Sequence, residues 1–92
     1  MHLEIVSPEA TLFSGEVDSV TVPGTSGSFQ MLNNHAPIVS SLKDGTVIIS
    51  GKIQLDDTVQ NKFNSKDDNT TLFEITSGTI EMRNNKLILL AD

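Results

Sequence analysis

The chain contains no cysteine, tryptophan or tyrosine, and only three prolines among its 92 residues. The absence of cysteine excludes disulfides, thiolate catalysis and cysteine-ligated metals. Without tryptophan and tyrosine, a stacking platform for bases or sugars would depend on four phenylalanines. The longest apolar run, Leu87–Ala91, is far shorter than the ~20 residues that span a bilayer. No secretory signal opens the sequence, so we expect a soluble protein of a reducing compartment.

Basic residues are also scarce. Six lysines and arginines stand against twelve acidic residues, which gives a formal net charge of −6. Nucleic-acid binding needs a basic surface, and attraction to anionic lipid needs a basic cluster, so both are excluded as primary functions. At 92 residues and 37% apolar composition, we expect residues 1–92 to form one domain with one core.

The residues that are abundant favour β-structure. Valine, isoleucine and threonine together number 24, whereas alanine occurs three times. No window predicts an amphipathic helix of 12 residues. Turn signals recur at short intervals and predict an all-β sandwich or barrel; they are Ser14-Gly15, Pro23-Gly24, Ser26-Gly27, Asp44-Gly45, Ser50-Gly51, Ser77-Gly78 and Asn84-Asn85.

The clearest strand pattern lies near the C-terminal end. Ile80 and Met82 alternate with polar residues, which predicts one buried and one exposed face. Asn84-Asn85 follows with two residues that tolerate positive φ, as a tight hairpin requires. Residues 86–90 then return as a nearly all-apolar strand. Such a strand is buried on both faces or lies beneath a partner.

Two other segments are less regular. Val17 is out of phase with Val20 and Val22, and a bulge near Asp18-Ser19 would bring the three onto one face. Residues 56–71 form the most polar stretch. We interpret them as a long hairpin with a mobile tip over 64–70, in which apolar residues are too sparse to bury a strong strand.

The sequence predicts no catalytic, cofactor-binding or metal-binding residues. We expect His2 to be frayed and exposed, and His35 to be hydrogen-bonded to a loop backbone, since no nucleophile or carboxylate pattern surrounds either. The acidic pairs at 56–57 and 67–68 lack EF-hand spacing, and adjacent side chains on a strand point to opposite faces. Taken alone, these residues therefore predict an acidic all-β interaction module.

The segment Pro23–Gly27 has a phosphate-loop appearance but lacks the lysine and the helix that cradle a nucleotide. We interpret it as a double turn that needs two glycines for backbone reasons. The glycosylation sequon Asn69-Thr70-Thr71 has no meaning without export, so it is discounted.

Three blocks in order resemble the epsilon subunit of the F-type ATP synthase. The central block, Val22–Pro37, resembles the family pattern P-G-x-x-G-x-F/L-x-x-L-x-x-H-A-P. The N-terminal residues 3–17 and the closing residues 77–92 are also similar. The resemblance covers nearly the whole chain and is weakest over 52–70.

The resemblance implies a flattened ten-stranded antiparallel β-sandwich of two five-stranded sheets. It also implies a non-catalytic rotor subunit of the central stalk, which links the gamma subunit to the c ring and couples proton flow to ATP synthesis. We expect it to lie at the cytoplasmic face of the bacterial plasma membrane and to meet the membrane only through the complex. No cofactor, nucleic acid or homo-oligomer is expected.

Individual positions follow from the same resemblance. A loop facing the c ring is expected at Ser26, Gly27, Ser28, Phe29, Gln30 and Met31. Ser7, His35 and Ser40 are expected to lie toward gamma. The chain departs from the family at Ser28, often acidic in relatives, at Gln30, often glycine, and at Asn33, often proline. The C-terminal helical hairpin of most family members is expected to be absent.

Two alternatives remain open from the composition. An acidic cytosolic adaptor explains the composition equally well but leaves the three blocks unexplained. A carbohydrate-binding β-sandwich would need exposed aromatic residues, which are scarce here. Co-purification with gamma, or retention on a glycan column, separates these functions.

Overall fold

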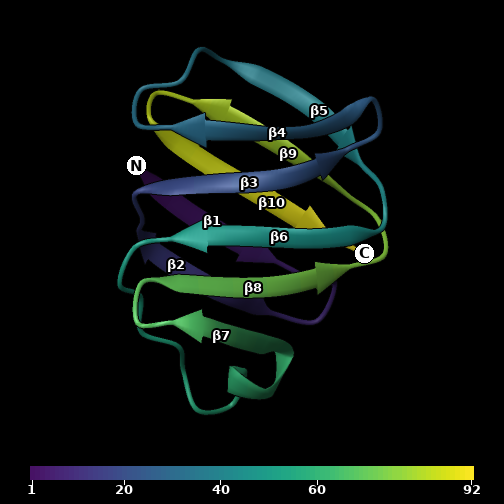
Figure 1. The fold of residues 1–92 in the computed structure, drawn as a ribbon. Helices are drawn as coiled ribbons and strands as arrows, with labels where there is room; N and C mark the ends of the chain where they lie inside the picture. The colour runs from purple at the N-terminus through teal and green to yellow at the C-terminus, as the bar shows by residue number, and fades with distance from the viewer.

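The computed structural model describes all 92 residues as ten strands and one short 3-10 helix. The strands form two layers that face each other (Figure 1). One layer has the order β2 (Thr11–Glu16), β1 (His2–Val6), β10 (Lys86–Ala91), β9 (Gly78–Arg83) and β5 (Ile38–Leu42). The other has the order β4 (Gly27–Leu32), β3 (Ser19–Gly24), β6 (Gly45–Ser50), β8 (Thr70–Ile75) and β7 (Phe63–Asp67).

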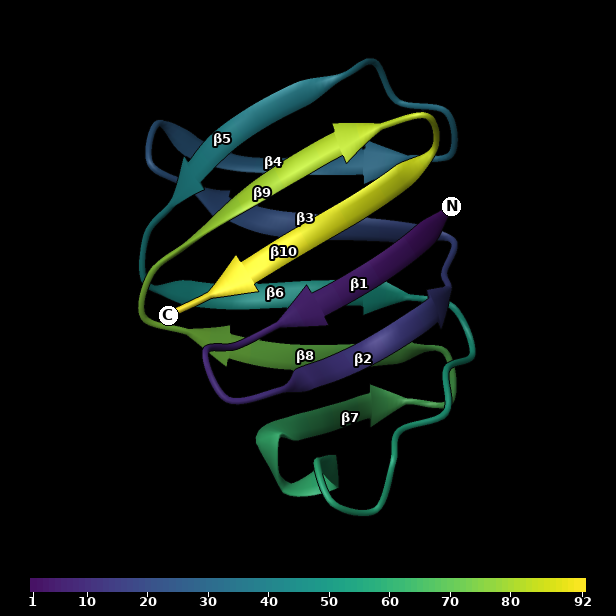
Figure 2. The same ribbon diagram turned by 180° about the vertical axis from the view of Figure 1, so that it is seen from behind.

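The all-β prediction is confirmed, with two corrections. Hydrogen bonding passes from one layer to the other where Gly24 pairs with Leu42, so two separate five-stranded sheets are not confirmed. The sheet is also not wholly antiparallel. β1 pairs in parallel with β10, His2 opposite Lys86 and Val6 opposite Leu90, as the two neighbouring strands in Figure 2 show.

Alternating side chains build the core between the layers. Leu3, Ile5, Leu87 and Leu89 from one layer are fully buried, as are Val20, Val22, Val47 and Ile49 from the other. The alternation predicted around Ile80 and Met82 is confirmed, since their exposed fractions are 0% and 1%. Asn84 and Asn85 adopt φ of 53° and 59°, which confirms the tight hairpin between β9 and β10.

The predicted bulge near Asp18 is wrong, because the chain changes layer at this point. β2 ends at Glu16 and β3 begins at Ser19. The Val17 N–H donates to the Met1 carbonyl (2.9 Å), whereas the Asp18 N–H donates to the Ser50 carbonyl (2.8 Å). Two consecutive amides thus bond to opposite layers. Val17 is buried at this crossing rather than within a strand.

The hairpin predicted over 56–71 is shorter in the structure. Only β7 and β8 form it, and the 3-10 helix Gln60–Lys62 precedes β7. Val59 and Phe63 are 8% and 7% exposed, but Phe63 is the one buried residue of β7, which confirms that apolar residues here are too sparse to bury a strong strand. The Phe63 ring stacks on Phe73, with centroids 4.8 Å apart. Aromatic stacking across β7 and β8 supplies burial that the sparse pattern concealed.

A two-residue turn, Thr25-Ser26, joins β3 to β4, and its two flanking glycines are needed for different reasons. Gly27 has φ of +130°, a conformation that disfavours side chains. A Cβ on Gly24 would lie 2.7 Å from the Gly27 carbonyl oxygen and 2.8 Å from the Phe29 ring. The prediction of two backbone-required glycines is confirmed, although the turn is single. No helix in the chain is long and apolar enough to cross a bilayer.

The Gly24→Ala variant should lower the free energy of unfolding by about 1–3 kcal/mol, since the new methyl group meets main chain that cannot move away. Ser26→Ala in the adjacent exposed turn is the matched control and should change it by less than about 0.5 kcal/mol. Urea denaturation followed by far-UV circular dichroism measures both. Equal midpoints for the two variants would contradict the assigned close contact.

Asp56 should titrate below the ordinary aspartate pKa. The Thr58 backbone N–H (3.0 Å) and then the Thr58 hydroxyl (2.9 Å) donate to its Oδ1, and these bonds lower the pKa because they favour the carboxylate. A pKa lowered on folding stabilises the folded state above the unfolded pKa, and this stabilisation disappears as the pH falls through the folded pKa. Thr58→Ala should raise the Asp56 pKa in an NMR titration of carboxyl carbons, and Thr76→Ala should not. An Asp56 pKa at the ordinary value in the parent chain would contradict this.

Candidate interaction surfaces

The predicted c-ring-facing loop is mostly a strand. Ser26 lies in the turn, but residues 27–31 belong to β4, which pairs in regular register with β3. Met31 is fully buried and Phe29 is half-buried. Only Ser26, Gly27, Ser28 and Gln30 of the six are exposed. The expectation of a loop was wrong here, because a two-residue turn leaves no room for a longer one.

The histidines are both hydrogen-bonded. His35, in the segment between β4 and β5, is half-buried, and its Nδ1 lies 2.7 Å from the Ala36 carbonyl oxygen. Its own N–H donates to the Leu32 carbonyl (3.1 Å). The prediction of a histidine bonded to loop backbone is confirmed. His2 is not frayed: it begins β1, with Nδ1 3.3 Å from Glu16 Oε2 and Nε2 3.2 Å from Ser14 Oγ.

The three predicted gamma-facing residues do not form a cluster. Ser40 is half-buried, lies opposite the buried Ile80, and donates to the Ser41 carbonyl (3.2 Å). Ser7 follows β1 and bonds the Ala10 carbonyl. His35 precedes β5 near the opposite end of this layer. Three strand spacings separate β5 from β1, about 14 Å. One protein interface of about 800 Å² per partner is wide enough to include all three.

The outer surface of the β5–β9–β10–β1 layer carries apolar side chains that ordinary solvent-facing strands lack. Val39 and Leu90 are 69% and 49% exposed, and Ile88 and Val6 are half-buried on the same surface. The register places Val39, Glu81, Ile88 and Glu4 in one row across the strands. Neither glutamate forms an ion pair. We call these six residues the outer face.

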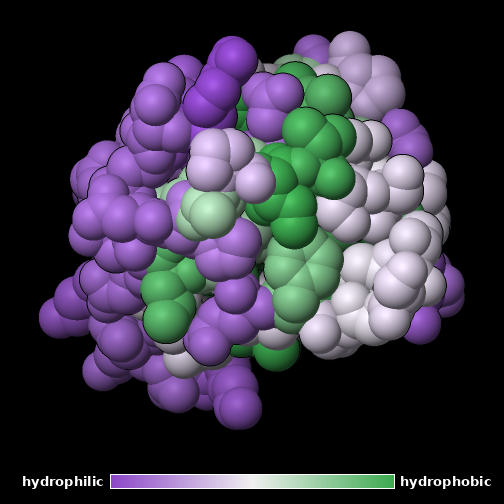
Figure 3. All heavy atoms as spheres, turned by 90° about the horizontal axis from the view of Figure 1, so that it is seen from above, coloured by the Kyte–Doolittle hydropathy of each residue, from purple (hydrophilic) through white to green (hydrophobic).

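The exposure of Leu90 contradicts the first of the two alternatives for residues 86–90. Leu87 and Leu89 are buried, but Leu90 points outward and remains exposed, so the strand is not buried on both faces. Figure 3, seen from the β4–β5 end, shows a band of hydrophobic atoms beside strongly hydrophilic ones. Val39 and the half-buried Ile38 and Phe29 lie at this end. The sequence signalled Leu90 by its apolar run, but it gave no signal for Val39.

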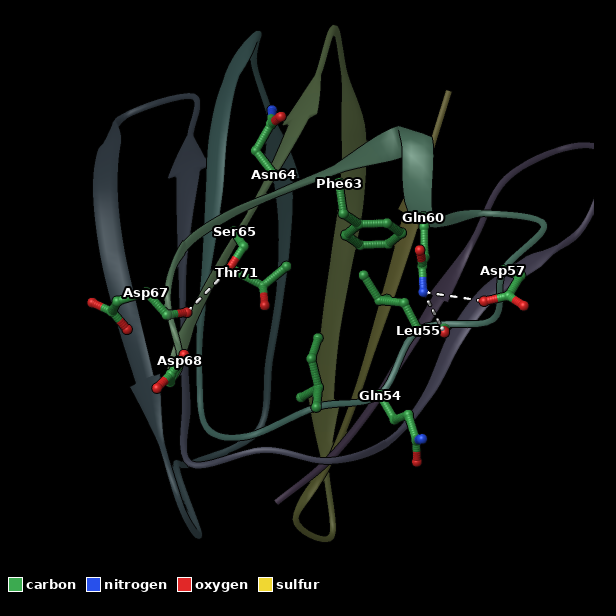
Figure 4. Close-up of a pocket in the computed structure, with 11 residues that line it drawn as sticks. Gln54, Leu55, Asp57, Gln60, Phe63, Asn64, Ser65, Asp67, Asp68 and Thr71 are labelled. Atoms are coloured by element: carbon green, nitrogen blue, oxygen red, sulfur yellow. Dashed lines mark hydrogen bonds between the residues drawn. The ribbon is translucent and has the colours of Figure 1, made fainter.

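The hollow beside β7 is polar. A cavity of about 520 Å³ beside β7 is lined mainly by polar side chains, with Leu55, Gln60 and Phe63 close together in Figure 4. Gln60 Nε2 donates to the Leu55 carbonyl (3.4 Å) and to Asp57 Oδ1 (3.3 Å). No group of three histidine, cysteine or acidic side chains is placed to hold a metal. The Gln60 side chain therefore ties together residues 55–60.

Comparison with known proteins identifies close sequence relatives. Residues 1–60 match the family model "ATP synthase, Delta/Epsilon chain, beta-sandwich domain". The ATP synthase epsilon chain of Chlorobaculum tepidum is 39% identical over 90 residues, which cover 98% of this chain and 86% of the relative. The ATP synthase epsilon chain of Caulobacter vibrioides is 37% identical over 93 residues, which cover 100% of this chain and 90% of the relative.

Solved structures show the same fold. A chain from the central stalk and c ring of the Tetrahymena thermophila mitochondrial ATP synthase matches with a TM-score of 0.69 at 17% identity. A chain from the Euglena gracilis mitochondrial ATP synthase matches with a TM-score of 0.73 at 13% sequence identity. These matches cover 99% and 97% of this chain, which spans 62% and 48% of the two structures' chains. With the family model and the full-length relatives, they confirm the resemblance seen in the sequence: the chain belongs to the ATP synthase delta/epsilon family.

Proposed function

We propose that this chain is a rotor subunit of an F-type ATP synthase, with the gamma subunit and the c ring as its partners. Similarity to epsilon chains along its whole length is the observation that carries the proposal. It performs no bond chemistry and couples rotation of the ring to gamma by holding the two together. Its place is the cytoplasmic face of a bacterial plasma membrane.

The outer face supports binding to gamma. Its apolar residues cost free energy when they are left in water, about 25 cal/mol per Å² of apolar surface. Glu4 and Glu81 lie among them without a basic partner in this chain. A gamma surface with apolar side chains and one or two lysines or arginines would complement both features. His35 precedes β5 and Ser7 follows β1, so both lie beside strands that carry this face, whereas Ser40 lies on the inner side of β5 opposite Ile80.

The c ring contacts the exposed part of the β3–β4 hairpin in this proposal. Ser26, Gly27, Ser28 and Gln30 are uncharged and accessible, whereas Phe29 and Met31 anchor the hairpin in the core. Close packing of 21 buried residues between the layers makes the domain stiff. A stiff body between two partners transmits rotation with little internal deformation.

The carbohydrate-binding alternative loses its support in the structure. Phe13, Phe63 and Phe73 are 8%, 7% and 6% exposed, and Phe29 is half-buried in the core. None offers a flat exposed ring on which a sugar could stack. Co-purification tests the proposal directly: the tagged chain should retain gamma and the c ring from detergent-solubilised membranes, and retention of neither would refute it.

Val39→Asp should weaken gamma binding at least about tenfold, because a central interface residue contributes about 2 kcal/mol or more. Val39 is 69% exposed, so the variant should fold normally. Ile48→Asp, on the outer surface of the other layer and 38% exposed, is the matched control and should bind as the parent does. Surface plasmon resonance with purified gamma measures both. Similar losses in both variants would argue against the outer face.

His35→Glu should weaken gamma binding more than Lys66→Glu. His35 is half-buried beside β5, whereas Lys66 lies in β7 at the far end of the molecule (Figure 1). The same assay compares the two charge changes, and thermal melting verifies that each variant is folded. Equal affinities at unchanged stability would remove His35 from the gamma interface.

A further inference from the structure

The connection between β4 and β5, residues 33–37, has few main-chain bonds. The β5–β9 ladder ends at Ile38, because Pro37 beside it has no N–H with which to extend the ladder. Within the connection, one main-chain hydrogen bond closes a turn, from the His35 N–H to the Leu32 carbonyl (3.1 Å). The turn holds Asn34 at φ of 62°, in the left-handed region. Main-chain bonding therefore ties this segment to the rest of the domain only through its ends.

The Asn85 side chain supplies a further tie, from the turn between β9 and β10. The Asn34 N–H donates to Asn85 Oδ1 (2.7 Å), and Asn85 Nδ2 donates to Asn33 Oδ1 (2.9 Å). Asn33 Oδ1 also accepts from the Met1 ammonium (3.0 Å), whereas the Asn34 N–H depends on Asn85 alone. Figures 1 and 2 both show the β9–β10 turn beside the β4–β5 connection. Both ends of one amide thus hold two successive residues that lie 52 and 51 positions away in the sequence.

The β9–β10 turn itself does not need this amide. Asn84 and Asn85 are its two central residues, and the hairpin requires positive φ at both, which glycine adopts as readily as asparagine. Asn84 is exposed, and its side chain takes part in no hydrogen bond, whereas Asn85 is half-buried. The Asn85 carbonyl accepts the His2 N–H (3.1 Å), a bond that any residue at this position can make. The Asn85 amide therefore acts on the β4–β5 connection and not on its own turn.

We infer that Asn85 is a positioning residue for the gamma contact, because its amide fixes the turn that carries His35. His35 directly follows Asn34, and its Nδ1 lies 2.7 Å from the Ala36 carbonyl oxygen. A turn without the Asn85 bonds would hold His35 in several orientations, and binding would then have to order it at a cost in free energy. This inference rests on the proposed function, which places His35 toward gamma.

The position of the turn favours gamma over the c ring as the partner that it serves. The connection leads directly into β5, which carries Val39 of the outer face. The tip of the β3–β4 hairpin lies at the other end of β4, since five residue steps separate Gly27 from Leu32, roughly 17 Å of strand. Asn85 therefore acts beside the outer face and away from the hairpin tip.

Asn85→Gly and Asn84→Gly form the matched pair that tests this. Both variants keep the positive φ of the hairpin and share the effect of glycine on the unfolded chain, but only Asn85→Gly removes the two hydrogen bonds. Purified gamma is the probe, and thermal melting verifies that each variant is folded. We expect Asn85→Gly to bind at least about fivefold more weakly and Asn84→Gly to bind within about twofold of the parent. Equal affinities of the two variants would overturn the inference.

A double-mutant cycle with His35→Ala separates positioning from a general loss of structure. His35→Ala alone should weaken gamma binding. In that background, Asn85→Gly should cause less than about a twofold further loss, because the residue that it positions is gone. An undiminished effect of Asn85→Gly in that background, or a His35→Ala variant that binds as the parent does, overturns the inference and leaves the proposed function standing. If the parent chain does not bind gamma, both fail.

Hydrogen exchange of the free chain gives a readout that does not depend on gamma. The Asn34 amide should exchange at least about tenfold faster in Asn85→Gly than in Asn84→Gly, because only the first variant removes its acceptor. The His2 amide, whose acceptor is the main-chain carbonyl of residue 85, should exchange alike in both. Equal exchange of the Asn34 amide in the two variants would show that Asn85 does not hold the turn, and would overturn the inference.

Discussion

The strand pairing of this domain passes from one layer to the other at one place, where Gly24 pairs with Leu42. Two neighbouring bonds strengthen this join: the Thr25 N–H donates to the Ser41 carbonyl, and the Lys43 N–H donates to the Pro23 carbonyl. Gly24 has no room for a side chain there. The join folds the ten strands over their own core and brings β4 and β5 to the same end of the molecule.

That arrangement places the two proposed contacts side by side. The outer face reaches the β4–β5 end through Val39, and β4 of the β3–β4 hairpin lies at the same end (Figure 1). Their chemistries differ: the face offers apolar side chains with two unpaired carboxylates, whereas the hairpin offers exposed uncharged residues. If both contacts form as proposed, the subunit would hold its two partners by different means, and a change in one contact need not weaken the other.

Local alternation was readable from the sequence, and pairing between distant segments was not. Ile80, Met82 and the Asn84-Asn85 hairpin were predicted because the pattern and the turn lie within a few residues. Val17 was misplaced because a crossing between layers interrupts the alternation of buried and exposed residues in the same way as a bulge does. The parallel pairing of β1 with β10 has no local signal. For the same reason, Val39 looks like any strand valine until its neighbours show that it faces outward.

The parallel pairing of β1 with β10 affects how the protein folds during its synthesis on the ribosome. β1 is made first, but its neighbour β10 begins 84 residues later, from His2 to Lys86. At a synthesis rate of about 5–20 residues per second, β1 waits roughly 4–17 s before that partner exists. During that time only the β2 hairpin can hold it, and an isolated two-stranded hairpin is marginally stable in water. The domain therefore completes its fold only after β10 has been translated, and until then β1 has only β2 as a neighbour.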